Sequence, residues 1–425
     1  MGVYRFEVKN FCRICGSNEL APYLDLGPQP PSNAFIPASA IESEVRIPLI
    51  VNLCQVCGNS QLSVVVSPDE TFGEYAYRSS SSRALVESFR SLATDVASYA
   101  DRQESRALVV DLGCNDGLFL SQLPRDEYRV LGVEPSSAAE DARDRGLEVE
   151  SVFFGEESAR ELLDEYGPAQ VITTSNVLAH VDDIHKFLEG VRIWLSPRGC
   201  YVLEFPYVKD MLEGLWFDTV YHEHVSYLAI TPLSRALADH GLRISRIDRH
   251  DVGGSGPFVR VFIEHATATD TPRADAELFM RRESIWGLNN QACYNTFAAA
   301  VGRLSEVLLE MINKASERDY RIGGFGAPAK GNTLLNSLGL TSRELISVAD
   351  NTQVKIGLVT PGSHIPIVDD QTFLTQQVDV ALLLSWNYAD FFMKHSEFIR
   401  RGGAFLNPFP TPELMSHTTR VRLGA

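Results

Sequence analysis

Long apolar runs are missing from this sequence. Over 425 residues, no uninterrupted apolar stretch reaches the ~18 residues that a membrane-spanning helix needs. The first ten residues, MGVYRFEVKN, also lack the apolar segment of a secretory signal. We therefore expect a soluble, cytoplasmic protein that has no membrane partner.

Blocks of positive charge are also absent. The formal net charge is −17, and no run rich in lysine and arginine interrupts this acidity. Such a chain repels a phosphate backbone, which argues against a nucleic-acid polymer as partner and requires a local basic pocket for an anionic substrate.

The sequence contains no tandem repeat, and its length allows two or three globular domains. It leaves open whether the protein is a monomer or a homo-oligomer.

Cysteines are few and unevenly placed. There are seven, and an odd number in a reducing compartment argues against a disulfide framework. Four of them form two Cys-x-x-Cys pairs, Cys12 with Cys15 and Cys54 with Cys57, in a segment with little apolar core. Four thiolates at this spacing suit one tetrahedral zinc ion, whose binding would stabilise that segment. Free structural thiols and a redox pair are the alternatives, and a closed four-thiolate site favours a structural role.

The rest of the chain alternates candidate buried strands with candidate helices. The first strands are ALVVDLG, YRVLGVE, AQVITTSN and CYVLEFP, and helices are expected at 79–100, 136–145, 156–166 and 183–194. After a long helical region near 274–317, further strands are expected at RIGGFG, LISVAD, DVALLLSW and GAFLNPF. Short strands separated by helices predict a parallel sheet with crossover connections. The sequence therefore predicts two α/β halves.

A glycine-rich turn follows the first of these strands. In VVDLGCNDGLFLSQL, Gly113, Asn115, Asp116 and Gly117 lie between a strand and a helix, and Glu134 ends the next strand. A carboxylate at that position can accept hydrogen bonds from ribose hydroxyls. Because Asn115 replaces the second glycine of G-x-G-x-x-G, a methyl donor with a ribose and no phosphate fits better than a pyrophosphate. The alternative is a turn that binds no ligand.

A second turn, GFGAPAK at 324–330, satisfies G-x-G-x-x-A, and Asp350 ends the following strand. Taken alone, this pattern favours a dinucleotide site. The adjacent Lys330, Gly331 and Asn332 equally favour a cradle in which backbone N–H groups and a lysine hold a nucleotide-sugar diphosphate. A purely structural turn is the third alternative.

Titratable side chains are concentrated in YHEH, shortly after the strand CYVLEFP. A histidine with a pKa near neutral can remove a proton, Glu223 can orient it, and Tyr221 can donate to a developing oxyanion. His222 and His224 could instead ligate a metal, although His-x-His lacks the i, i+4 spacing of a helical zinc site, or they could be ordinary histidines. The pattern favours general-base chemistry.

Two further segments carry candidate residues. His180, in VITTSNVLAHVDD, follows another expected strand and would lie at the same carboxyl edge as the methyl-donor turn. Tyr75 and Tyr77, in FGEYAYRSSSS, lie at an expected domain junction, where they would either reach over a cleft or simply pack.

Taken together, these motifs resemble those of a known family. They are CRICG, LCQVCG, DLGPQPPSNAF, EYAYRSSSS, DLGCNDG, NVLAHV, YHEHVSY, GAPAKGNTLLN and PGSHIPI, and they run through nearly the whole chain. The chain resembles the sugar C-methyltransferases that act on nucleotide-linked keto-deoxysugars in natural-product pathways. The resemblance implies an α/β fold with a zinc-binding N-terminal domain (1–70), a Rossmann-like domain that binds S-adenosylmethionine (71–250) and a Rossmann-like C-terminal domain (251–425) that helps to bind the nucleotide sugar.

The resemblance also implies roles for individual residues. Zinc would be bound by Cys12, Cys15, Cys54 and Cys57, and S-adenosylmethionine by Gly113, Cys114, Asn115, Asp116, Gly117, Glu134 and Asn176. The catalytic set would have His224 as the leading base, with Glu223, Tyr221, His222, His180 and Tyr75. The nucleotide sugar would contact Tyr77, Lys330, Gly331 and Asn332.

The reaction implied by the resemblance is methylation of carbon 3 of a dTDP-linked 4-keto-6-deoxysugar, through a base-generated enolate that attacks the donor methyl group. Carbon 5 is the alternative position. The rival functions are an O- or N-methyltransferase, a nicotinamide-dependent oxidoreductase and a non-catalytic zinc-knuckle scaffold. The family commonly shows a compact His-Gly-Gly-Ser-Leu-Arg stretch, whereas residues 250–260 read HDVGGSGPFVR, which leaves the sugar contacts of that loop open.

Overall fold

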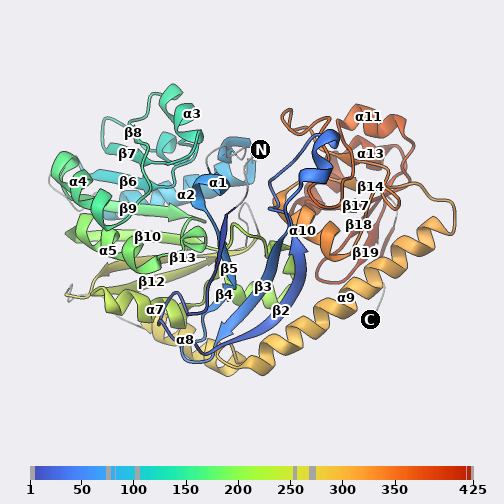
Figure 1. Ribbon diagram of the computed structural model, residues 1–425. Helices are drawn as coiled ribbons and strands as arrows, with labels where there is room; N and C mark the ends of the chain where they lie inside the picture. The colour runs from blue at the N-terminus through green and yellow to red at the C-terminus, as the bar shows by residue number, and fades with distance from the viewer. Residues whose placement is uncertain are drawn as a thin grey trace.

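The computed structural model describes residues 5–72, 78–81, 83–100, 106–251, 256–267, 274–417 and 419–422 (Figure 1). The N-terminal part contains β1 (Phe6–Val8), β2 (Leu20–Gln29), β3 (Ile47–Cys54), β4 (Ser60–Leu62), β5 (Val64–Val66) and α1 (Pro68–Phe72). Strands β2, β3 and β4 are antiparallel, and β1 pairs with β5. The four-stranded sheet is completed by β11 (Ser226–Tyr227), which pairs with β4 although it is far away in the sequence.

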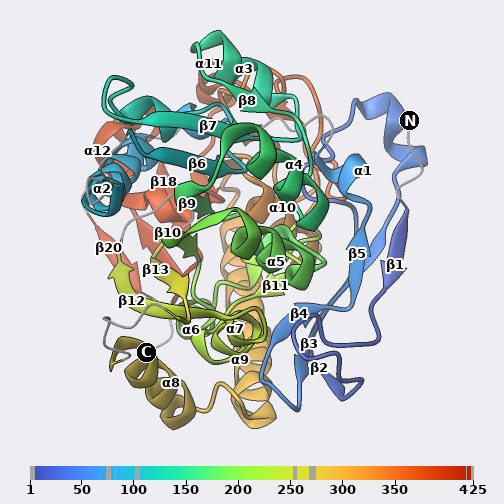
Figure 2. The same ribbon diagram turned by 90° about the vertical axis from the view of Figure 1, so that its left-hand side faces the viewer.

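The second part is a seven-stranded sheet with helices on its faces. Its helices are α2 (Arg83–Ala100), α3 (Ala138–Asp144), α4 (Glu156–Tyr166), α5 (Ile184–Trp194), α6 (Val208–Glu213) and α7 (Ile230–Asp239). Its strands are β6 (Leu108–Leu112), β7 (Arg129–Val133), β8 (Val149–Glu150), β9 (Ala169–Ser175), β10 (Leu195–Phe205), β12 (Leu242–His250) and β13 (Phe258–His265). They follow one another in the order β12-β13-β10-β9-β6-β7-β8 from bottom to top in Figure 2.

The pairing of β13 shows where this sheet ends along the chain. Strand β13 lies antiparallel between β10 and β12, so the sheet continues to His265. The boundary expected at 250/251 therefore falls inside a β-hairpin of the sheet. A period-two pattern identifies such a strand but does not say which sheet it joins, because the pairing is decided by long-range packing.

The third part is a second α/β sheet. Its helices are α10 (Ala329–Ser337), α11 (Asp370–Thr375), α12 (Ala389–His395) and α13 (Glu397–Arg400), and its strands are β14 (Ile322–Phe325), β15 (Val348–Ala349), β16 (Ile367–Val368), β17 (Val380–Leu383), β18 (Ala404–Asn407), β19 (Glu413–Met415) and β20 (Arg420–Arg422). Strands β16-β15-β14-β17-β18 are parallel, and β19 and β20 extend the sheet in antiparallel pairing. The prediction of a mixed α/β, Rossmann-like architecture is confirmed.

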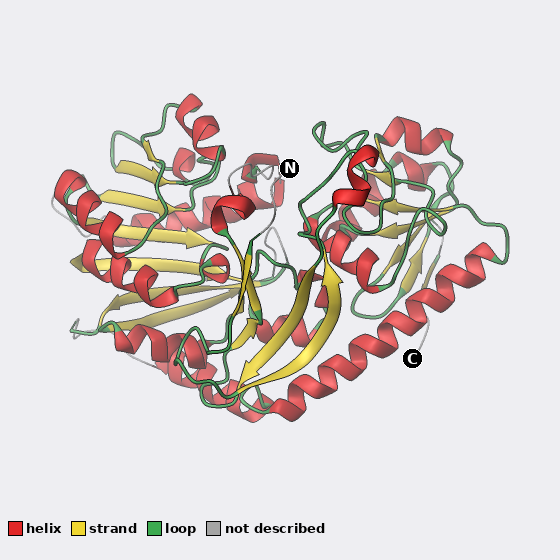
Figure 3. Ribbon diagram, in the orientation of Figure 1, coloured by secondary structure: helices red, strands yellow, loops and turns green. Residues whose placement is uncertain are grey.

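Helices α8 (Ala274–Trp286) and α9 (Gln291–Ser316) connect the two α/β parts, and α9 runs from one to the other along the base of the molecule in Figure 1. At about 1.5 Å per residue, its 26 residues span about 39 Å. One face is buried at helical spacing, with Tyr294, Phe297, Val301, Leu304, Leu308 and Ile312. The strands of the N-terminal sheet lie between the two α/β parts (Figure 3).

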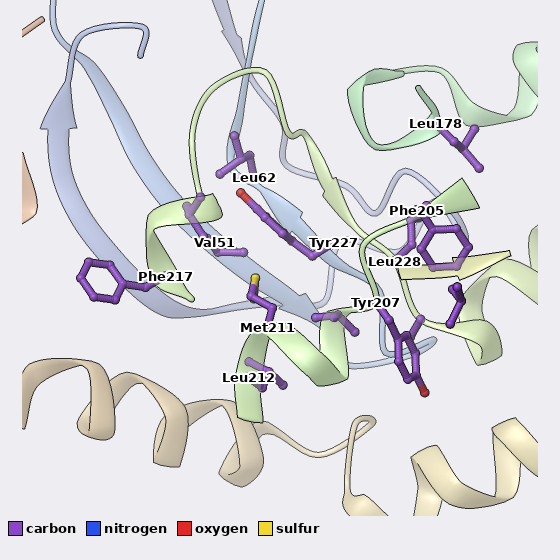
Figure 4. Close-up of a cluster of buried hydrophobic side chains, with 14 of the residues drawn as sticks. Val51, Leu62, Leu178, Phe205, Tyr207, Met211, Leu212, Phe217, Tyr227 and Leu228 are labelled. Carbon is purple, nitrogen blue, oxygen red and sulfur yellow. The ribbon is translucent and has the colours of Figure 1, made fainter. Parts of the chain in front are cut away.

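A shared apolar core joins the N-terminal sheet to the part built on the seven-stranded sheet. Val51 and Leu62 of the N-terminal sheet belong to the same buried cluster as Leu178 and Phe217, which belong to loops at the carboxyl edge of the seven-stranded sheet (Figure 4). These loops are therefore packed between two parts of the chain. Within the described ranges, every helix is too short or too polar to cross a membrane.

Candidate active site

The four N-terminal cysteines converge on one point. Their sulfur atoms all lie within 4.8 Å of one another, with 3.5 Å between Cys12 and Cys57 and between Cys15 and Cys54. A tetrahedral zinc ion with Zn–S bonds of about 2.3 Å requires sulfur atoms about 3.8 Å apart. The four cysteines therefore fit zinc and fill all of its coordination positions, which makes the site structural.

The backbone around the cysteines has the form of two tight turns. The Gly16 N–H donates to the carbonyl of Cys12 at 2.9 Å, and the Gly58 N–H donates to that of Cys54 at 3.0 Å. Both glycines have positive φ angles, +69° and +76°, which side chains with a Cβ rarely adopt. A glycine after each Cys-x-x-Cys pair therefore lets the chain turn back and present both thiolates to one ion.

The turn after β6 is tightly constrained. Gly113 and Gly117 have φ angles of +73° and +72°, and Asn115 has a φ of 52°. A Cβ on Gly113 would lie 2.5 Å from a methyl group of Val177, and one on Gly117 would lie 2.1 Å from Leu147. Both glycines are thus required by backbone conformation and by close packing.

Glu134 holds this turn in place. Its two carboxylate oxygens accept from the backbone N–H of Asn115 and of Ser136, each at 2.9 Å, and its side chain is buried. Each oxygen keeps a second lone pair, so the carboxylate can also accept from ribose hydroxyls. These residues fit a ligand that carries a ribose, as the sequence predicts.

Serine residues that sequence reasoning missed complete the turn. The N–H of Ser79 donates to Asn115 Oδ1 at 2.9 Å, and that of Ser80 donates to Asp116 Oδ2 at 3.1 Å. Arg145 also contacts Asp116, at 3.2 Å. The short 3-10 turn at 79–81 thus packs on the glycine-rich turn at 113–117, hereafter the donor turn, and α2 begins at residue 83 instead of at 79 as expected. The Cys114 side chain lies beneath the turn, close to the backbone of Gly132.

Asp111 is a second residue that the sequence did not single out. It is buried in β6, just before Gly113, and its carboxylate accepts from the Thr173 hydroxyl at 2.6 Å. Burial raises its pKa to about 7. Asn176 begins the loop after β9 with a φ of 60°, and its N–H donates to the Glu204 carbonyl at 2.9 Å.

His224 is held in one orientation. Its Nδ1 lies 2.9 Å from the carbonyl of Thr219, and its Nε2 lies 2.9 Å from the Tyr221 hydroxyl. Because a carbonyl only accepts, Nδ1 carries the proton, so Nε2 of the neutral ring accepts from the hydroxyl. Burial lowers the pKa of His224 to about 4, which keeps the ring neutral at pH 7.

The structure brings His180 to the same place. Its ring meets that of His224 edge to face, with the ring centroids 5.0 Å apart. Burial, with a smaller contribution from His224, lowers the pKa of His180 well below its usual value. The two neutral imidazoles come from loops 44 residues apart in the sequence (224 − 180), both at the carboxyl edge of the sheet.

The neighbours of His224 point elsewhere. The His222 Nε2 lies 3.2 Å from the carbonyl of Ile47, and its Nδ1 has no hydrogen-bond partner among the described residues. Glu223 is buried and accepts from the Asn33 amide at 2.6 Å, and burial raises its pKa to about 7. Within the described part of the chain, the cysteine cluster is the one group of three or more side chains placed to hold a metal.

Lys330 lies at the start of α10, where it is largely buried. Its ammonium donates to Asn387 at 2.5 Å and sits over the Trp386 ring, 4.1 Å from the centroid. The Trp386 indole N–H donates to the buried Asp218 at 2.6 Å. Burial lowers the pKa of Lys330 to about 8 and raises that of Asp218 to about 6. The sequence indicates Lys330 but not its neighbours Asp218, Trp386 and Asn387, because these lie on other segments.

The rest of the second glycine-rich turn is packed against its surroundings. The Asn332 amide donates to the carbonyl of Ser32 at 2.7 Å, and a Cβ on Gly331 would meet Leu384 at 2.8 Å. Asp350 accepts from the N–H of Ala327 at 2.7 Å. Tyr75 and Tyr77 lie outside the described residues.

Strand β13 carries an ion-pair network. Arg260 is fully buried and donates to Glu204 at 2.7 Å, and it also pairs with Asp95 of α2. Glu204 lies near the end of β10 and accepts from the Ser175 hydroxyl at 2.6 Å. Arg260 therefore ties the sheet to α2, beside the loop that begins at Asn176.

Three family models match consecutive parts of the chain. A zinc binding domain matches residues 12–72, a methyltransferase domain 86–246 and a C-methyltransferase C-terminal domain 252–410. The C-methyltransferase NovU of Streptomyces niveus is 32% identical over 408 residues, which cover 95% of this chain and 96% of NovU. The chain belongs to the C-methyltransferase family. This membership decides against the oxidoreductase and the non-catalytic scaffold considered from the sequence.

Other matches cover parts of this C-methyltransferase. The ubiquinone biosynthesis O-methyltransferase of Chelativorans sp. is 28% identical over 148 residues, 32% of this chain and 58% of that protein. Among solved structures, the mitomycin 7-O-methyltransferase MmcR is 18% identical with a TM-score of 0.32, covering 43% of this chain and 54% of that one. The magnesium protoporphyrin IX methyltransferase ChlM of Synechocystis PCC 6803 is 13% identical with a TM-score of 0.31, covering 42% and 79%.

The C-methyltransferase uses S-adenosylmethionine as its methyl donor, and its four-cysteine module binds zinc. Both groups agree with the residues present: the constrained turn with Glu134 suits the ribose of the donor, and the closed set of four thiolates suits a structural ion.

Proposed function

We propose that this C-methyltransferase methylates carbon 3 of a dTDP-linked 4-keto-6-deoxysugar, with His224 as the base that forms the enolate. The observation that carries the proposal is the arrangement of His224, whose Nδ1–H is fixed by the Thr219 carbonyl while Nε2 faces the Tyr221 hydroxyl. This orientation leaves one ring nitrogen able to accept a proton. The loop of His224 is at the same carboxyl edge of the sheet as the donor turn, and open α/β sheets bind their ligands at this edge.

The chemistry requires a base and an oxyanion donor. A carbon beside a keto group becomes nucleophilic only after it loses a proton, and the negative charge then moves to the keto oxygen. Bound S-adenosylmethionine supplies an electrophilic methyl group. The protein must therefore take up one proton and stabilise one developing oxyanion, with both groups aligned.

His224 and Tyr221 can perform these two tasks in sequence. The neutral Nε2 takes the proton from the sugar carbon, and in doing so it stops accepting from the Tyr221 hydroxyl. That hydroxyl is then available to donate to the enolate oxygen. A histidine whose pKa is about 4 is a weak base by itself. During the reaction, however, the negative charge of the enolate forms beside the ring and stabilises the protonated imidazolium.

The other candidate residues support binding in this proposal. The ring of His180 packs against that of His224. The neighbouring Glu223 accepts a hydrogen bond from Asn33, which attaches the segment 221–224 to the N-terminal part. The diphosphate would be bound by Lys330, Gly331 and Asn332, and the ammonium of Lys330 would exchange its bond to the neutral Asn387 amide for one to an anionic oxygen. Tyr77 would contact the sugar. The buried Lys330 ammonium should bind a negatively charged diphosphate oxygen more strongly than a neutral amide, because a charge-assisted hydrogen bond is stronger away from water.

The test is product analysis with methyl-labelled S-adenosylmethionine and a panel of dTDP-linked 4-keto-6-deoxysugars, read by mass and two-dimensional NMR. We expect a labelled methyl group on carbon 3. A label on carbon 5 would establish the alternative position, and a methoxy or N-methyl signal would overturn the proposal.

The base is tested with two histidine variants. His224→Ala should lower kcat by about 100-fold or more while the S-adenosylmethionine Kd stays unchanged, since general-base catalysis contributes about 10²–10⁴-fold. His417→Ala, at an exposed position, is the control. A His224→Ala protein with wild-type kcat would remove the base assignment.

A further inference from the structure

Arg13 lies between two zinc ligands, yet its side chain leaves the zinc module. The side chain is 1% exposed, and its guanidinium donates to the carbonyl of Leu62 at 2.8 Å and to that of Val64 at 3.3 Å. Its Nε donates to Asp182 at 2.9 Å, 169 positions away in the sequence. A fork of fixed N–H groups that serves three acceptors at once is a property of arginine and not of lysine.

Asp182 belongs to the loop between β9 and α5. Its second carboxylate oxygen pairs with Lys9 at 2.7 Å, so both of its oxygens are held by residues of the N-terminal part. A second contact lies three residues further on, where the ring of His185 meets the carbonyl of Ile14 at 2.8 Å. The turn between Cys12 and Cys15 therefore touches residues 182–185 at two points.

This loop carries His180. Asn176 begins it, Leu178 is buried in the core shared with the N-terminal sheet (Figure 4), and Asp183 ends it by capping α5 through the N–H of Lys186 at 3.0 Å. His180 lies two residues before Asp182, with its ring against that of His224. An anchor at Asp182 therefore limits how far His180 can move from His224.

We propose that Arg13 is a positioning residue, through which the zinc module holds the His180 loop in its active arrangement. The inference rests on the proposed function, because it takes His180 and His224 as the site of proton removal. Zinc fixes the turn that carries Arg13, Arg13 fixes Asp182, and Asp182 fixes the loop. The module would then act on the transfer step more than on donor binding. Glu134 and the turn at 113–117, which fit the donor ribose, lie on other segments, and Asn176 at the start of the loop is held separately by the Glu204 carbonyl.

The test uses Arg13→Lys and Asp182→Asn in the full-length zinc-loaded protein, with Arg5→Lys as the control. Arg5 forms an exposed ion pair with Glu70 in the same part of the chain. We expect each of the first two variants to lower kcat by about 10- to 100-fold on the dTDP-linked sugar that the enzyme methylates, because small misplacements of reacting groups have effects of this size. The control should keep wild-type kcat.

Three measurements separate positioning from loss of structure. Zinc content should remain one ion per chain, and the S-adenosylmethionine Kd should stay within twofold of wild type. Hydrogen exchange should rise in peptides that cover 176–185 and stay unchanged in peptides that cover 128–136. The Arg13→Lys/Asp182→Asn double variant should lose no more than the worse single variant, because both changes remove the same contact.

Some results would overturn the inference. They are wild-type kcat in both single variants, additive losses in the double variant, unchanged exchange at 176–185, or a loss of activity that follows loss of zinc. The proposed function fails separately: a fully active His224→Ala would refute the base, whereas an inactive His224→Ala with fully active Arg13→Lys and Asp182→Asn would refute only the role of Arg13.

Discussion

Replacing Glu223 by glutamine should stabilise the protein increasingly as the pH rises from about 4.5 to about 7. The carboxylate is buried and accepts one hydrogen bond, from Asn33 at 2.6 Å, and burial raises its pKa from 4.5 to about 7. At about 1.36 kcal/mol per pKa unit, this shift corresponds to ~3 kcal/mol. Glutamine keeps the shape and an oxygen for Asn33, but it carries no charge to bury.

The sign follows from proton binding. Between pH 4.5 and 7 the folded wild type holds a proton at Glu223 that the unfolded chain has released, so its stability falls as the pH rises through this window. The glutamine variant has no such loss. The difference in free energy of unfolding, variant minus wild type, should therefore grow by up to ~3 kcal/mol across the window and stay level above pH 7.

The assay is the midpoint of thermal unfolding, Tm, measured for both proteins at fixed ionic strength from pH 4.5 to 8. All other titrating groups are common to the two proteins, so the difference isolates Glu223. Glu127→Gln, at an exposed position, is the control and should show no trend. A Tm difference that is flat with pH, or that shrinks as the pH rises, would refute the argument that burial disfavours the charge.

Four further predictions concern the active site, the glycine-rich turn at 113–117 with Glu134, and zinc. Tyr221→Phe should lower kcat by about 10- to 100-fold with little change in S-adenosylmethionine Kd, as measured by steady-state kinetics and calorimetry, because it removes the proposed oxyanion donor; an equal loss in donor affinity would contradict this. Glu134→Gln should weaken donor binding about tenfold in calorimetry, since a charged acceptor is replaced by a neutral one that also loses its bond to one backbone N–H. Gly117→Ala should destabilise the protein by ~1–3 kcal/mol in thermal unfolding, because its Cβ would lie 2.1 Å from Leu147, whereas Gly155→Ala, which meets nothing within 4 Å, should be tolerated. Removing zinc with a chelator should lower Tm and increase hydrogen exchange at residues 12–62; unchanged exchange there would argue against a structural ion.

Most of the secondary structure could be predicted because it depends on local pattern. Leu85, Phe89, Leu92 and Val96 recur at helical spacing, and all four are buried in α2. The helix expected at 156–166 coincides with α4, and the one expected at 183–194 begins one residue later because Asp183 is its N-cap. The helix expected from Ser79 begins instead at Arg83, since the serines form a separate turn on the donor site.

The four-cysteine metal site and the donor turn could also be predicted from the sequence, because the residues of each motif lie close together along the chain. The spacing of each Cys-x-x-Cys pair lets one turn present two thiolates, and the geometry of the four sulfur atoms agrees with that prediction. The donor turn and Glu134 follow two adjacent strands, and adjacent parallel strands bring their carboxyl ends together.

The sequence by itself determined the α/β architecture, the thiolate module and the donor turn, since each depends on periodicity or on residues a few positions apart. The tertiary structure alone decided that β11 joins the N-terminal sheet, that His222 points away from His224, and which buried polar groups pair. The contacts of Arg13 with Asp182 and of Asn33 with Glu223 join residues 169 and 190 positions apart. No local pattern specifies such pairs, because they form only where packing of the whole chain places two segments side by side and shields their polar groups from water.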